Sequence, residues 1–81
     1  MPMMMDGALA RLCSHVAIEE AEALAEWLRT TADAVVDLSA CEAIHSAVLQ
    51  VLLVYRPRCA APPPDPILAA LLSPLPAEVP A

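Results

Sequence analysis

The sequence predicts a small α/β protein, and three features of the chain indicate this fold class. Residues 3–13 favour two strands joined by a tight turn, and residues 18–30 have the spacing of an amphipathic helix. Residues 34–38, which follow that helix, are short, apolar and β-branched, as in a buried strand. A strand, a helix and a second strand in this order predict a βαβ unit, in which the two strands pair in parallel. The length of 81 residues is sufficient for one domain.

The first two strands are predicted from the dipeptide formed by Asp6 and Gly7. This dipeptide stands between the methionine run 3–5 and the apolar segment 8–13. Asp-Gly favours the tight turns that connect neighbouring antiparallel strands. The segment 8–13 is also the strand that we expect to pair in parallel with 34–38.

The helix over 18–30 is predicted from apolar residues that recur at helical spacing. These residues are Ile18, Ala21, Leu24, Ala25 and Leu28. The acidic residues gather in the first turns and Arg29 lies in the last turn, an arrangement that complements the helix dipole. Trp27 falls at the edge of the acidic face, and we expect it to be a half-buried lid on the helix.

A second helix is predicted over 46–56, and Pro57 ends it. Apolar side chains lie nearly all around this helix. Two arrangements fit such a helix: it is wholly buried, or one half is buried while the other half docks to another molecule. We favour the second arrangement because a domain of this size buries only part of its surface. The chain as a whole is 59% hydrophobic, which also predicts an exposed apolar patch for a partner.

The chain beyond the second helix is rich in proline. The prolines of 57–66 predict a stiff, extended linker, in which 58–61 add a short edge strand. Asp65 and Pro66 then open a last helix over 67–72, because Asp is a favoured N-cap and Pro is favoured at the first helical position.

We therefore divide the chain into two parts. Residues 1–61 form the core of the domain. Residues 62–81 form a proline-rich linker with a short C-terminal helix and a tail, and we expect the tail to be irregular from residue 73. The sequence contains no internal repeat.

The charge of the chain excludes some classes of partner. Its net charge is −6, with four basic residues, whereas nucleic acids and anionic membrane surfaces need a basic surface. The apolar run 44–55 is shorter than the roughly 20 residues that span a bilayer, so we expect no membrane insertion. Three cysteines, an odd number, and the lack of a signal-peptide pattern predict a cytoplasmic protein with free thiols.

We expect neither an enzyme nor a cofactor. The chain contains one glycine, Gly7, so it cannot form a glycine-rich cradle for phosphates. It also contains no nucleophile elbow and no motif of paired carboxylates.

A group of Cys and His residues allows a metal-binding site as an alternative function. If the two predicted strands run parallel, the residues after them fall at one edge of the sheet. These residues are Cys13, His15, Cys41 and His45. Thiolates and imidazoles are the ligands that zinc prefers, but the spacings match no structural zinc module closely. The other interpretation is a pair of buried thiols and a pair of loop histidines.

Ser46 stands where the chain enters the second helix, and two interpretations are open for it. Serine is a preferred N-cap, which is a purely structural role worth about 1 kcal/mol. A phosphate on Ser46 would instead lie at the positive end of the helix dipole and add about two negative charges beside an apolar face. Such a charge would block a hydrophobic partner.

The segment 35–53, with the sequence VVDLSACEAIHSAVLQVLL, resembles the core of STAS domains. In that family a hydrophobic strand ends in Asp-Leu, and Asp-Ser-Ser-Gly-Leu then leads into an apolar helix. Asp37, Leu38, Ser46 and Leu49 match this pattern. The resemblance extends over about residues 5–56 and includes the predicted hairpin and first helix.

The resemblance implies a small STAS-like mixed sheet with helices packed on one face, and a function in binding a partner protein. In the anti-sigma-factor antagonist branch, an anti-sigma kinase phosphorylates the serine that Ser46 matches. The chain departs from the family at His45, where the family has Asp, and at Ala47 and Val48, which replace Ser and Gly. The STAS subunits of bacterial phospholipid transporters are a second branch that the resemblance allows.

We therefore predict a non-enzymatic interaction module that docks a protein partner, similar to an anti-sigma kinase or a transporter subunit, through the edge formed by 40–51. The docking residues that we expect are Glu42, His45, Ser46, Ala47, Val48, Leu49 and Val51. Two alternatives remain. One is a homodimer or larger homo-oligomer that pairs through the exposed Val/Leu face of the second helix. The other is the Cys/His metal-binding protein described above.

Overall fold

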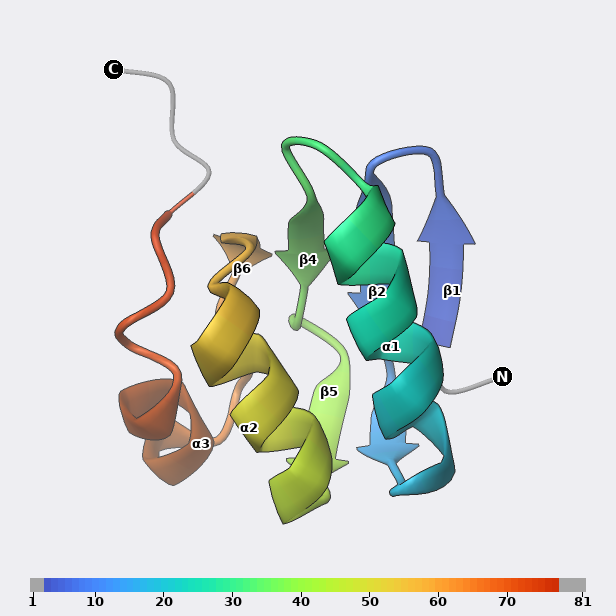
Figure 1. Cartoon of the computed structure of the whole chain (residues 1–81). Coiled ribbons are helices and arrows are strands. Elements are labelled where there is room, and N and C mark those ends of the chain that lie inside the picture. Colours follow the sequence, from blue (N-terminus) through green and yellow to red (C-terminus); the bar gives the residue numbers. More distant parts are fainter. Residues whose placement is uncertain (1–2, 78–81) are drawn as a thin grey trace.

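Strands and helices follow one another closely along the chain in the computed structural model, which describes residues 3–77 (Figure 1). Their order is β1 (Met3–Asp6), β2 (Leu9–Leu12), β3 (Ser14–Val16), α1 (Glu19–Thr30), β4 (Val35–Asp37), β5 (Cys41–Ile44), α2 (Ser46–Tyr55), β6 (Arg58–Ala61) and α3 (Pro66–Leu71). The predicted α/β class is therefore confirmed. None of the helices in this part of the chain has both the length and the apolar character to cross a membrane.

A four-stranded mixed sheet has the order β1-β2-β4-β6. β1 and β2 form the predicted antiparallel hairpin, whose turn contains Gly7 with a positive φ of 62°. Such a backbone conformation carries little cost for glycine. β2 pairs in parallel with β4, and β4 pairs in parallel with β6, so the predicted βαβ unit and the edge strand at 58–61 are both confirmed.

A second, two-stranded sheet is formed by β3 and β5, which run parallel and prolong β2 and β4 beyond a bend. Ser14, with φ of 56°, provides the bend after β2. After β4, the Asp37 carboxylate accepts a hydrogen bond from the Ser39 backbone N–H at 2.9 Å, which forms an Asx turn. This sheet was not predicted, because we expected a loop between Leu38 and the second helix.

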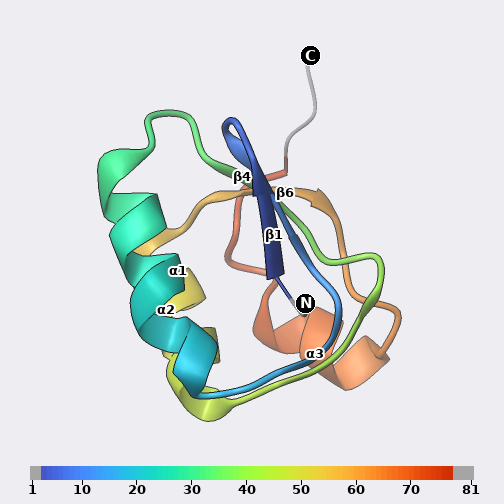
Figure 2. The ribbon, with the colours of Figure 1, turned by 90° about the vertical axis from the view of Figure 1, so that its right-hand side faces the viewer.

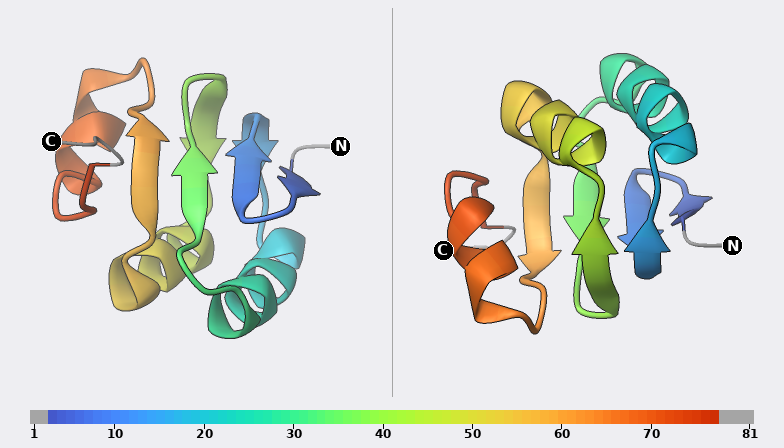
Figure 3. Two further views of the ribbon diagram at one scale, coloured as in Figure 1. Left: turned by 90° about the horizontal axis from the view of Figure 1, so that it is seen from above. Right: turned by 90° about the horizontal axis from the view of Figure 1, so that it is seen from below.

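Helices α1 and α2 cover the same face of the strands, whereas α3 lies beside the β6 edge (Figures 2 and 3). Between the two helices and the sheet lies a core of Leu, Val, Ala, Met and Cys side chains. Its fully buried members include Ala10, Leu12, Leu24, Val36, Leu38, Cys41, Val48 and Leu52. The strand positions that alternate with these residues, such as Arg11, lie on the face of the sheet that α1 and α2 do not cover.

The C-terminal segment packs into the same core. Leu68, Leu72 and Leu75 are buried within the same hydrophobic cluster as the sheet residues. The Asp65 carboxylate caps α3 as predicted, since it accepts a hydrogen bond from the Ile67 N–H at 2.9 Å. The tail was expected to be irregular, but Ala77 forms an isolated parallel bridge to β6. The remainder of that tail, 78–81, is outside the described residues.

Candidate functional site

The entrance of α2 lies at the carboxyl ends of β3 and β5. Ile44, the last residue of β5, pairs with Val16, and the backbone N–H of the next residue, His45, donates to the Val16 carbonyl oxygen at 2.8 Å. The chain then turns directly into α2. The start of this helix is therefore fixed to the sheet by backbone hydrogen bonds, and its first residues project from the edge of the molecule.

His45, and not Ser46, is the N-cap of α2. The backbone of His45 is extended (φ −62°, ψ 146°), and its Nδ1 atom accepts a hydrogen bond from the Ala47 N–H at 3.0 Å. Ser46 already has helical geometry as the first residue of the helix. The predicted capping role of Ser46 is therefore wrong, because a capping side chain must come from the residue just before the helix to reach the orphan N–H groups.

Ser46 is exposed in this position. As the first helical residue, it lies beside backbone N–H groups that carry the positive end of the helix dipole. The serine hydroxyl is thus accessible to a modifying enzyme. A phosphate on this hydroxyl would find favourable electrostatics at the helix N-terminus.

The predicted docking residues differ in their accessibility. Three of them, Glu42, His45 and Ser46, are exposed. Another three are half-buried at the sides of α2 or in its first turn, namely Ala47, Leu49 and Val51. Val48 is completely buried beneath the helix and belongs to the core, so its assignment to the docking surface is corrected. A partner can touch the other six without unfolding the helix.

Ile18 lies in a different environment from the one that its spacing predicts. We expected it on the buried face of the first helix, but it precedes α1 at the N-cap position and its side chain is 55% exposed. It lies two residues after Val16, which bonds to His45, and it therefore adds an apolar group to the same edge. The signal that could have placed it is the acidic run from Glu19, which marks the first helical turn.

We define the α2 entrance surface as the accessible residues of this edge. They are Ile18, Glu42, His45, Ser46 and Ala47, together with Leu49 and Val51, which lie on opposite sides of the helix. The surface combines apolar side chains with one acidic group and an exposed hydroxyl. It offers contact area and hydrogen-bonding groups, a composition suited to a protein partner.

The four residues of the alternative metal cluster do not all converge, although the Cys13 thiol lies close enough to Cys41 to affect its pKa. Cys41 is buried, Cys13 is half-buried, and His15 is exposed. His45 uses its Nδ1 atom to cap α2. Nowhere between residues 3 and 77 do three or more His, Cys, Asp or Glu side chains converge in a manner that could hold a metal ion. Burial raises the pKa of the Cys41 thiol to about 11, so the thiol is protonated at neutral pH.

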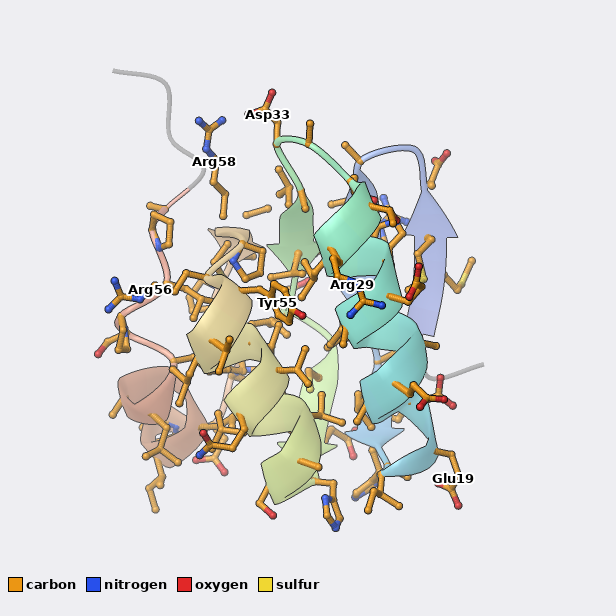
Figure 4. The ribbon with its side chains drawn as sticks, in the orientation of Figure 1. Glu19, Arg29, Asp33, Tyr55, Arg56 and Arg58 are labelled. Atoms are coloured by element: carbon orange, nitrogen blue, oxygen red, sulfur yellow. The ribbon has the colours of Figure 1, made fainter. Side chains whose placement is uncertain are left out.

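The opposite end of α2 carries a different set of side chains. Tyr55 in the last turn of α2 and Arg29 in the last turn of α1 point toward one another (Figure 4). The Tyr55 side chain, together with Glu26, raises the pKa of Arg29. Val54 beside Tyr55 is 71% exposed. The apolar helix α2 thus has two separate accessible ends, and the exposed hydroxyl of Ser46 is at the end where the helix begins.

A half-open cavity of about 210 Å³ lies apart from both ends of α2. Its walls come from β6, the following prolines, α3 and the tail, and include Cys59, Pro62, Leu72 and Leu75. The Cys59 thiol donates to the Ala61 carbonyl oxygen at 3.2 Å, and burial raises its pKa. The lining is almost entirely apolar and provides no converging polar groups of the kind that catalysis requires.

Comparisons with protein-family models, with curated proteins and with solved structures give no match to this chain.

Proposed function

We propose that this chain is a STAS-like interaction module that binds a protein partner through the α2 entrance surface. The observation that carries the proposal is the exposed apolar side chain of Ile18, two residues after Val16, whose carbonyl oxygen bonds to the His45 N–H at the exposed start of α2. Ile18 contributes little to the core in this position, so a partner that covers it would gain buried apolar surface at no cost to the fold.

Two further features support the proposal. The order of the elements, with a hairpin, a βαβ unit and two helices on one face, agrees with the arrangement that the resemblance to STAS domains implies. In addition, the segment that carries this resemblance, 35–53, runs from β4 through β5 into α2 and includes most of the α2 entrance surface. A bacterial regulatory or assembly subunit is the class of protein that these features favour.

Phosphorylation of Ser46 would switch this docking. The hydroxyl is exposed at the first position of the helix, close to the apolar side chains that the partner would cover. A phosphate there is favourable for the free protein because of the helix dipole, but its two charges would have to be desolvated in the complex. Modified protein would therefore bind the partner less tightly.

The docking surface is tested with Ile18→Asp. This change removes the exposed apolar group, and it places a favoured N-cap residue where α1 has no side-chain cap, so the fold is preserved. Affinity capture on the immobilised protein, quantified by mass spectrometry, should recover a partner with the wild type and lose it with Ile18→Asp. Val54→Asp at the far end of α2 is the matched control and should retain the partner. Equal recovery with all three proteins would refute the surface.

The switch is tested separately with Ser46→Glu and Ser46→Ala. We expect Ser46→Glu to weaken capture of the partner and Ser46→Ala to preserve it. Light scattering on the purified wild-type protein measures its oligomeric state and so tests the alternative of a homo-oligomer. A stable dimer that Val54→Asp dissociates would favour self-association through the Val/Leu face of α2 over a separate partner.

A further inference from the structure

The two edges of the four-stranded sheet differ in how they are protected. At the β6 edge, the Cys59 N–H donates to the Pro76 carbonyl oxygen at 2.7 Å, and prolines follow the strand directly. At the other edge, β1 pairs with β2 alone among the described strands, and no described segment lies along its outer side (Figures 1 and 3). An unprotected edge strand is a template for another strand.

The register of the hairpin identifies the backbone groups that β1 leaves unpaired. Asp6 and Leu9 close a two-residue turn and are therefore a hydrogen-bonded pair. Hydrogen-bonded pairs alternate along an antiparallel ladder, so Met4 also directs its N–H and C=O groups toward β2. Met3 and Met5 direct theirs outward. A strand added at this edge would bond to Met3 and Met5.

Apolar side chains flank this edge on both faces of the sheet. Met4 is 57% exposed on the open face, and Met5 is 37% exposed on the face that α1 covers. The side of α1 that is turned away from α2 lies toward β1 (Figure 1). Because Arg29 lies on the α2 side, the 3.6-residue turn brings the half-buried Trp27 to the β1 side. An added strand would contact the methionines, and Trp27 lies on the side of α1 that faces this edge.

Acidic groups lie around this edge. Asp6 is exposed at the turn end of β1. Glu19 projects from the first turn of α1, on the β1 side of the helix and below the lower end of β1 (Figure 4). The nearby cation, Arg11 on the open face, lies 4.0 Å from Asp37, which offsets its charge. The edge therefore presents a short apolar stretch between negative charges.

We propose that β1 accepts an extended segment of a partner protein, a short apolar stretch flanked by Lys or Arg, as an additional strand of the sheet. Outward backbone groups would provide the hydrogen bonds, and the flanking side chains would select the sequence. A second copy of this chain is disfavoured because it carries the same net charge of −6, whereas a segment with Lys or Arg is attracted to the acidic surroundings of β1. This interface is separate from the α2 entrance surface.

Trp27, the single tryptophan of the chain, makes a direct test possible. The probes are capped peptides with the sequences Lys-Val-Thr-Val-Lys and Glu-Val-Thr-Val-Glu, titrated against the full chain at low salt. We expect the basic peptide to change the Trp27 fluorescence and to bind at least about tenfold more tightly than the acidic one, with a difference that shrinks as salt screens the charges. Equal binding of the two peptides, or no binding of the basic one, overturns the proposal.

Backbone pairing is tested with Met5→Pro. Proline is tolerated in an edge strand whose N–H faces solvent, so the hairpin is preserved while an outward donor is removed. We expect Met5→Pro to weaken the affinity for the basic peptide about tenfold, which corresponds to the loss of one or two hydrogen bonds. Met5→Val and Ile18→Asp are the controls and should retain the wild-type affinity. If Met5→Pro does not fold, N-methylation of the peptide backbone makes the same test on the wild type, and undiminished binding of that peptide overturns the proposal. A wild-type dimer that Met5→Pro dissociates would assign the edge to a second copy instead.

Discussion

His45 caps the N-terminus of α2, a role that the sequence pattern predicts for the next residue, Ser46. A neutral imidazole can accept a hydrogen bond through Nδ1, and that atom accepts from Ala47 N–H. Aspartate at the same place would also accept this bond, and its negative charge would complement the helix dipole. His45 therefore preserves the geometry of the turn without the charge.

The contribution of this cap can be measured by substitution. We expect His45→Ala to lower the free energy of unfolding by about 1 kcal/mol, because the Ala47 N–H loses its acceptor. His45→Asp should restore or exceed the stability of the wild type. Urea unfolding followed by circular dichroism gives both values, with Gln50→Ala on the exposed side of α2 as the control. A His45→Ala protein as stable as the wild type would mean that the cap is not formed in solution.

The raised pKa of the buried Cys41 thiol predicts that the free energy of unfolding decreases at alkaline pH. Its thiol has a pKa of about 11 in the folded protein, compared with 9.0 for an unperturbed thiol, because burial disfavours the thiolate. Between these values the unfolded chain has lost the proton and the folded chain keeps it. The unfolded state then binds fewer protons, so the free energy of unfolding decreases as the pH rises from 9 to 11, by at most about 3 kcal/mol.

Urea unfolding at pH 8 and pH 10.5 measures this loss. Cys41→Ala lowers the stability at both values because it leaves a small cavity, but it should remove most of the difference between them. Cys13→Ala, at a half-buried thiol, is the control and should retain the difference. A pH dependence that is unchanged in Cys41→Ala would contradict the assignment to this thiol.

At the scale of elements, α2 ends in a conformation that its sequence does not favour. Arg56 forms the C-cap with a left-handed backbone (φ 51°, ψ 56°), and its N–H donates to the Leu52 carbonyl oxygen at 2.8 Å. Glycine is the usual residue in this conformation because it has no Cβ. Pro57 follows immediately and forces the chain out of the helix.

We expect Arg56→Gly to raise the free energy of unfolding by about 1 kcal/mol, since glycine relieves the left-handed strain. Arg56→Ala is the matched control, because it removes the charge and retains the Cβ, and it should not stabilise the protein. Thermal unfolding in a calorimeter measures both. Equal effects of the two changes would attribute the result to the charge of Arg56 and not to its backbone.

Most elements could be predicted because their signals are local. The turn at Gly7, the acidic first turn of α1 and the Asp65 cap each act within a few residues. β3 and β5 could not be predicted in this way. They are only three and four residues long, and they depend on the bend at Ser14 and on pairing with each other.

The candidate site was predicted only in part, for a related reason. α2 is apolar on almost every side, so its period does not reveal which face is buried. Val48 was therefore wrongly predicted to lie on the docking surface. Ile18 was wrongly predicted to be buried because α1 begins one residue later than expected. The Val48 error concerns the orientation of α2, which is decided by its packing against the sheet and not by its composition, whereas the Ile18 error concerns the boundary of α1.

At the scale of the whole molecule, the C-terminal segment contributes to a single core. Leu68, Leu72 and Leu75 are buried against the sheet side chains, and each contributes about 1.5–3 kcal/mol when removed from water. A domain of this size buries a smaller share of its surface than a larger one, so it has little other buried area to offset their loss. The proline-rich part 62–77 is therefore needed for the stability of the fold and is not only a linker.

We expect a chain that ends at residue 61 to be largely unfolded, because it loses all three leucines together with the cover of β6. Circular dichroism and urea unfolding compare it with the full chain. A triple substitution, in which the same three leucines become alanine in the full-length chain, is the control and should destabilise the protein to a similar degree. A cooperative unfolding transition in the shortened chain would show that 1–61 is an independent core.

The bond between Cys59 and Pro76 also has a consequence for how the chain is made. Synthesis proceeds from the N-terminus, so the six strands described between residues 3 and 77 leave the ribosome before residues 72–76, which complete the cover of β6. For that interval the nascent sheet has two open edges in place of one. Until residues 72–76 emerge, the β6 edge is thus open to mispairing with neighbouring chains on the same messenger.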